Sequence, residues 1–150
     1  MKLATALSER ADLQRRISEL SVRLNNNSKV QEGEQPSEDP KELLRELDQD
    51  FQRLEDLIAK INHTNNETKQ NGVSLTDLLA KRDCLKQRVS IMRSFLDNAS
   101  EKVNRYSKAE IKILSTVSVS KLQSEVDALS KKLRETDEQI QGLNWTTELI

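Results

Sequence analysis

The sequence has little of what builds β-sheets, disulfides or thiolate metal sites. Its 150 residues include only three glycines, two prolines and 3% aromatic residues. This composition disfavours the many turns of a β-protein and favours long uninterrupted helices. The single cysteine, Cys84, excludes an internal disulfide and a metal cluster of several thiolates from one chain. We therefore expect an all-α protein with one domain over residues 1–150, in which Cys84 is a half-buried hydrophobe.

Long apolar runs and an excess of charge of one sign are also missing. The 24 basic and 25 acidic residues leave a net charge of −1, so no phosphate-neutralising surface is evident and nucleic acid is not an expected partner. No stretch approaches the roughly 20 apolar residues of a membrane span. The first residues meet Glu9 and Arg10 too early for a secretory signal. These features predict a cytoplasmic protein without a membrane function.

What the sequence does contain is apolar residues at alternating spacings of three and four, the pattern of a coiled-coil seam. In the most regular stretch the seam consists of Leu44, Leu47, Phe51, Leu54, Ile58 and Ile61, and it continues into Asn65 and Thr68. Three further helices have the seams Leu3, Ala6, Arg10, Leu13, Ile17, Leu20 and Leu24; Leu78, Arg82, Leu85, Val89, Met92, Leu96, Ala99, Val103 and Tyr106; and Leu122, Val126, Leu129, Leu133, Thr136, Ile140 and Leu143. The pattern predicts four long helices in an antiparallel coiled-coil-like bundle.

Local signals place the ends of these helices. Asp39 can cap a helix that has Pro40 at its first position, and Ser74 with Asp77 offers a second cap after the loop at Gly72. Between the third and fourth helices, residues 108–119 alternate β-branched and polar side chains, which predicts a short strand. Its partner would be the stretch around Val30 or a second subunit.

Two groups of polar residues are candidate sites. If the second and third predicted helices fold back on each other near Gly72, Arg82 of the seam lies opposite polar side chains. The group comprises Asn62, Asn65, Arg82, Asn144 and Trp145. It would fix helix pairing, or Arg82 would hold a small anion. Residues 29–39 have no helical period and form an acidic loop, in which Glu32 and Glu34 are candidate ligands for a divalent metal ion.

The remaining patterns favour an interaction protein over an enzyme. No Ser-His-Asp or Cys-His set, glycine-rich phosphate loop or Glu-x-x-His pair occurs at a usable spacing. Beside the seam of the third helix, Ile91 and Phe95 form an additional apolar line that needs a neighbour. We therefore expect a homo-oligomeric structural or interaction module, a dimer or a multiple of dimers, with a metal-binding, anion-binding or enzymatic protein as the alternative.

Four short motifs are similar to a known family. They are Lys-Val-Gln-Glu-Gly-Glu at 29–34 with Asp39-Pro40, Ile61-Asn62 with Thr64-Asn65, Arg105-Tyr106-Ser107 with Glu110-Ile111, and Leu143-Asn144-Trp145-Thr146-Thr147. As a set they resemble the septicolysin-like bacterial family over nearly the whole chain. The resemblance implies a bacterial helical protein, and the family name implies a haemolysin. The absence of a long apolar run or a Trp-rich loop argues against membrane insertion.

Overall fold

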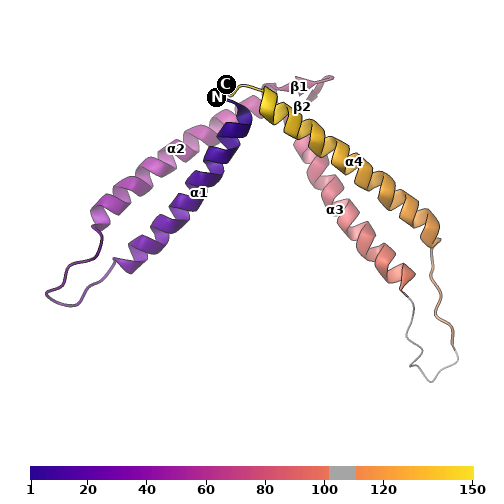
Figure 1. Ribbon diagram of the computed structural model, residues 1–150, viewed down its shortest axis with the longest axis horizontal. Coiled ribbons are helices and arrows are strands. Elements are labelled where there is room, and N and C mark those ends of the chain that lie inside the picture. Colours follow the sequence, from indigo (N-terminus) through magenta and orange to yellow (C-terminus); the bar gives the residue numbers. More distant parts are fainter. Residues whose placement is uncertain (102–110) are drawn as a thin grey trace. The chain divides into compact units, whose positions relative to one another are not determined.

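The computed structural model describes residues 1–101 and 111–150 and confirms an all-α fold with four helices. The helices are α1 (Leu3–Asn26), α2 (Pro40–Glu67), α3 (Leu75–Ser100) and α4 (Val119–Thr146) (Figure 1). Two compact units are present, one formed by Met1–Leu75 with Gly142–Ile150 and the other by Thr76–Gln141. The single domain over residues 1–150 stays a prediction.

The short β segment lies between α2 and α3, and not between the third and fourth helices as predicted. A two-residue hairpin, β1 (Lys69–Gln70) with β2 (Val73–Ser74), joins α2 to α3, and Asn71 and Gly72 at its tip both have positive φ. Asn-Gly suits such a turn because both residues tolerate this conformation. The strand predicted at 108–119 is wrong for residues 111–118, which have no strand, while residues 108–110 lie outside the described part. Alternating β-branched residues do not make a strand without a partner, and residues 29–39 form a loop.

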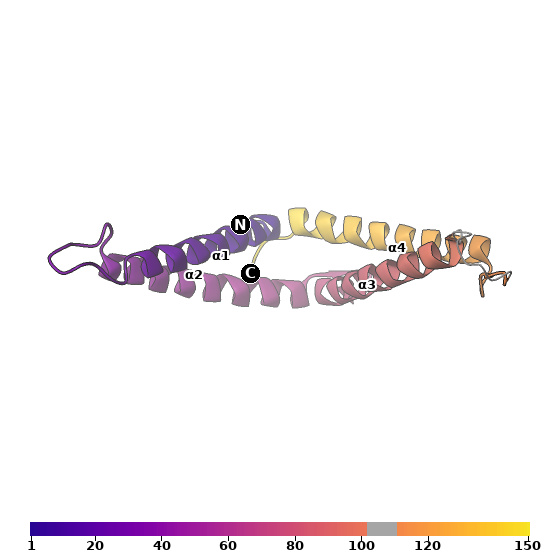
Figure 2. The same cartoon turned by 90° about the horizontal axis from the view of Figure 1, so that it is seen from below.

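In the first unit, α1 packs along α2, as Figures 1 and 2 both show. The predicted seam of α1 is confirmed, with Leu3, Ala6, Leu13 and Leu20 buried. The start of α2 is also confirmed, since the Asp39 side chain accepts a hydrogen bond from the backbone N–H of Lys41. α1 ends at the predicted Asn-rich stretch.

The buried face of α2 differs in phase from the predicted seam. Its buried residues are Leu43, Asp50, Leu54, Leu57, Ile61 and Thr64. Leu44 and Phe51, which were predicted to face the interior, are 54% and 50% exposed. Two adjacent lines of residues at heptad spacing face α1, namely Leu43, Asp50, Leu57 and Thr64, and Leu47, Leu54 and Ile61. A third line, at Leu44, Phe51 and Ile58, lies at the edge of this contact. α2 is therefore apolar over a wider stripe than α1 covers.

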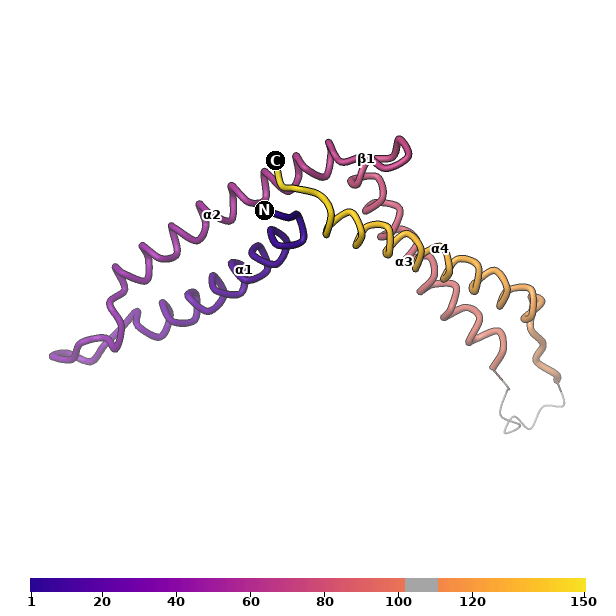
Figure 3. The backbone as a smooth tube through the Cα atoms, turned by 45° about the horizontal axis from the view of Figure 1, so that its top comes forward, coloured from indigo at the N-terminus to yellow at the C-terminus, as the bar shows by residue number. Residues whose placement is uncertain are grey.

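The two ends of the chain meet in the first unit (Figure 3). The backbone N–H of Leu3 donates to the carbonyl of Thr147, and that of Leu149 donates to the carbonyl of Met1. Thr64 of α2 joins this contact, because its buried Oγ1 accepts a 3.1 Å hydrogen bond from the backbone N–H of Ile150. The polar end of the α2 stripe thus anchors the C-terminal tail.

Thr64→Val should lower the free energy of unfolding by about 1 kcal/mol, because the isosteric side chain cannot accept the hydrogen bond from Ile150. Urea denaturation followed by circular dichroism measures the change. Thr146→Val is the matched control, since the exposed Thr146 hydroxyl bonds only within its own helix, to the carbonyls of Gly142 and Leu143. Equal losses in the two variants would show that the tail contact contributes nothing specific.

In the second unit, α3 and α4 present the predicted seams to each other. Leu96 of α3 packs against Leu122 and Val126 of α4, with Met92, Val117 and Val119 at the edge of the cluster. The Arg93 guanidinium also donates a 3.0 Å hydrogen bond to the Ser130 hydroxyl. The start of α3 at Leu75 directly follows the predicted capping residue Ser74. For α4 the sequence allows Ser118 or Ser120 as the cap, and the helix starts at Val119, directly after Ser118.

Candidate functional site

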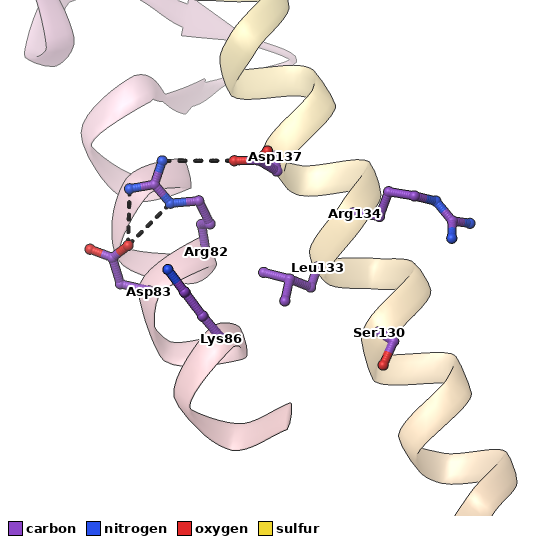
Figure 4. Close-up of a pocket in the computed structure, with 7 residues that line it drawn as sticks. All are labelled: Arg82, Asp83, Lys86, Ser130, Leu133, Arg134 and Asp137. Carbon is purple, nitrogen blue, oxygen red and sulfur yellow. Dashed lines mark hydrogen bonds and ion pairs between the residues drawn. The ribbon is translucent and has the colours of Figure 1, made fainter. Parts of the chain in front are cut away.

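Arg82 occupies a seam position of α3 and lies in a hollow between α3 and α4. The hollow has a volume of about 520 Å³ and is lined by Arg82, Asp83, Lys86, Ser130, Leu133, Arg134 and Asp137. The Arg82 guanidinium donates hydrogen bonds of 3.0 and 3.1 Å to Asp83 Oδ1 and lies 3.8 Å from Asp137 Oδ1 (Figure 4). Two carboxylates therefore already pair with the positive charge of Arg82 that a bound anion would use.

Figure 4 also shows Arg134 pointing away from α3, so of the other two cations in the hollow only Lys86 extends toward Arg82. The Arg82–Asp137 pair joins the two helices across their seam and suits a role in fixing their pairing. Whether Arg82 fixes helix pairing or holds an anion stays a prediction, and its α4 neighbour Asp137 is a carboxylate that sequence analysis missed. A signal was available, since Asp137 directly follows the predicted seam residue Thr136.

The other members of the predicted polar group belong to the first unit. Asn144 is buried, Asn65 is half-buried, and Asn62 and Trp145 are exposed. Their grouping with Arg82 stays a prediction. The buried polar residue that sequence analysis missed at this end of α2 is Thr64, which holds the C-terminal tail.

The acidic loop uses two of its carboxylates for structure. Glu38 accepts hydrogen bonds from Arg23, and Asp39 caps α2. Glu32 and Glu34 are exposed, and their role as metal ligands stays a prediction. Across the part of the chain that the structure describes, no three His, Cys, Asp or Glu side chains gather in a group that could hold a metal ion.

One flank of α1 carries a charged residue at every seventh position, and each of these residues is ion-paired. The pairs, with nitrogen–oxygen distances, are Arg53 to Glu9 (2.6 Å), Arg16 to Asp50 (3.0 Å) and Arg23 to Glu38 (2.5 Å). The first two join α1 to α2, and the third ties the acidic loop to α1. Hydrogen bonds from Arg53 and Arg23 lower the pKa values of Glu9 and Glu38, respectively. These ion pairs hold α2 and the acidic loop against α1, and each of the paired charges already has a partner.

The pKa of Glu148 is lowered as well, by hydrogen bonds from Lys2 and the Met1 amino group. Glu9, Glu38 and Glu148 thus each titrate below their ordinary value of 4.5 in the folded chain. Between the folded and unfolded pKa values the unfolded chain binds more protons, so this stabilisation is present above about pH 4.5 and disappears as pH falls through the folded values.

We expect the melting temperature to fall between about pH 5 and pH 3 and to fall less steeply when all three carboxylates are replaced by glutamine. Thermal melts followed by circular dichroism measure both slopes. A matched triple variant at Glu32, Glu34 and Glu101, which are exposed, should retain the native slope. Equal flattening in both variants would contradict the assignment of the acid sensitivity to Glu9, Glu38 and Glu148.

The predicted oligomer contact lies on the outside of α3. Ile91 is 70% exposed and Phe95 is 47% exposed, while Val89 and Leu96 of the neighbouring seam are buried. Cys84, on the same side of the helix, is exposed and not half-buried as predicted. Within residues 1–101 and 111–150, no helix is long and apolar enough to cross a bilayer.

Comparison with known proteins gives a family but no activity. Residues 10–149 match the model of a family of unknown function, DUF6847. The crystal structure of a functionally unknown conserved protein from Corynebacterium diphtheriae is similar, with 40% sequence identity, a TM-score of 0.92, and coverage of 100% of this chain and 99% of that chain. No curated protein sequence matches this chain.

The resemblance to the septicolysin-like family is wrong, because neither the matching family nor the similar structure has a link to septicolysin. The motifs that suggested it include ordinary structural segments, such as the Asp39-Pro40 helix start and the Thr146-Thr147 helix end. Such segments recur in unrelated helical proteins and do not identify a family. The haemolysin hypothesis falls with the resemblance. The chain belongs to the family of unknown function DUF6847.

Proposed function

We propose that this protein is a homo-oligomeric interaction module of the bacterial cytoplasm, in which Ile91 and Phe95 of α3 contact a second copy. The observation that carries the proposal is the exposure of these two large side chains one helical turn apart, beside a seam that α4 already covers. Burying Phe95 would contribute roughly 2 kcal/mol. The chain has only two phenylalanines, so an exposed one is a notable part of its apolar surface.

Two packed helices with an apolar line outside their shared seam gain stability when another helix covers that line. A pair of helices buries one seam, and any further apolar line on either helix remains in water until another helix covers it. The strand at 108–119, whose unpaired edge would have been a second reason to associate, does not form in residues 111–118. The proposal therefore depends on the helix faces alone.

Phe95→Glu should reduce the oligomer to a monomer of 17.2 kDa while leaving helix content unchanged, because the new charge lies at the contact and not in the core. Light scattering gives the mass and circular dichroism gives the helix content. Ser90→Glu adds the same charge at an exposed position of α3 that points away from Ile91 and Phe95, and it should leave the mass unchanged. A native mass of 17.2 kDa at micromolar concentration would contradict the proposal, as would a Phe95→Glu variant that unfolds.

A further inference from the structure

We propose that the outer face of α3 in one copy packs against the outer face of α2 in a second copy. The outer face of α3 is defined by Lys81, Cys84, Arg88, Ile91 and Phe95, and the outer face of α2 by Leu44, Asp48, Phe51, Glu55 and Ile58. This inference rests on the proposed self-association and names the surface that covers Phe95.

The outer face of α2 carries an apolar line that its own unit leaves about half exposed. Leu44 and Phe51 are 54% and 50% exposed, and Ile58 is half-buried two turns further on. These residues recur every seven positions, so they stay on one side of the helix along about 21 Å of its length at 1.5 Å per residue. The residues of the α3 face, from Lys81 to Phe95, extend over the same length. The two faces are therefore of matched size.

The charges on the two faces decide which surface pairs with which. Asp48 and Glu55 lie between the apolar residues of the α2 face, and both are exposed. Lys81 and Arg88 are the charged residues of the α3 face and are also exposed, so the two faces carry charges of opposite sign. Pairing α2 with α2 would bring carboxylates of two copies together, and pairing α3 with α3 would bring cations together. Pairing α2 with α3 sets acid against base and is favoured over both like-with-like alternatives.

The net charge of each whole helix has the same sign as the charge of its outer face. α2 contains seven acidic residues against four Lys or Arg, whereas α3 contains three acidic residues against five. A contact between α2 and α3 also uses both exposed faces of every copy in a single type of interface. Repetition of that interface would give a closed dimer or a larger assembly, and the mass distinguishes these.

Charge reversal tests the pairing with the full-length protein. Asp48→Lys with Glu55→Lys makes both faces basic, and Lys81→Glu with Arg88→Glu makes both faces acidic. Each double variant should self-associate at least about tenfold more weakly than the native protein at low salt. An equimolar mixture of the two should form a mixed oligomer, because each basic face then meets an acidic one. The variant with all four changes should associate like the native protein.

Light scattering of each sample, with native mass spectrometry of the mixture, measures these outcomes. Gln49→Lys and Ser90→Glu, at exposed positions on other sides of α2 and α3, are the controls and should not change the mass. If the native protein is oligomeric but the α2 reversal has no effect, or the mixture forms no mixed oligomer, this inference is overturned and the proposed function stands. A monomeric native protein would overturn both.

Discussion

Leu57→Ala is expected to lower the free energy of unfolding by about 2–5 kcal/mol, the usual cost of removing a fully buried leucine side chain and leaving a cavity. Leu57 is 0% exposed and lies in the middle of the α2 face that packs against α1. The flanking buried residues, Leu54 and Ile61, are held in the same seam and cannot move to fill the space. Urea denaturation followed by circular dichroism measures the loss.

Leu44→Ala is the matched control, because it removes the same atoms from the same helix at a position that is largely exposed. Its cost should be below about 1 kcal/mol and should depend on protein concentration, since Leu44 belongs to the face assigned to a second copy. The cost of Leu57→Ala should not depend on concentration. A larger loss for Leu44→Ala than for Leu57→Ala at high dilution would support the seam predicted from the sequence and would contradict the packing of Leu57 against α1.

The contrast between Leu44 and Leu57 shows what periodicity can determine. It identifies α2 as a helix with an apolar stripe, and the shared line Leu47, Leu54 and Ile61 was predicted correctly. It cannot choose between the two lines that flank this shared line. One flank, at Leu44, Phe51 and Ile58, is more apolar, whereas the flank that packs on α1 contains Asp50 and Thr64. The pairing with α1 decided the phase, and that is a tertiary effect.

Features set by neighbouring residues were more predictable than features set by distant ones. The start of α2 follows from Asp39 and Pro40, and the seams of α1, α3 and α4 follow from regular spacing. The β1–β2 hairpin was not predicted, although Asn71-Gly72 at its tip is a usual local signal for such a turn. Arg82 was correctly identified as a polar seam residue, but Asp137 could be found only once α3 and α4 were paired. Ion pairs between helices depend on register, which a single sequence does not specify.

Asp50→Leu is expected to raise the free energy of unfolding by about 1–3 kcal/mol, because a hydrophobic side chain of similar reach avoids the cost of burying the carboxylate, whose Arg16 partner is exposed. Asp50 is 6% exposed in the α1–α2 seam, and its Oδ2 has no hydrogen-bond partner among residues 1–101 and 111–150. Only Oδ1 is paired, at 3.0 Å from the exposed Arg16. Leucine would continue the apolar line between Leu43 and Leu57, and Arg16 would remain in water.

Arg16→Gln removes the same ion pair from the other side and should have the opposite sign. It leaves the Asp50 carboxylate buried without a cation, so we expect a loss of about 1–3 kcal/mol. Urea denaturation of both variants measures the two changes. A loss of stability in Asp50→Leu would show that the carboxylate contributes more than the leucine that replaces it. A gain in stability together with a changed oligomeric mass would instead assign Asp50 the role of specifying which helices pair, as single polar residues do in coiled-coil seams.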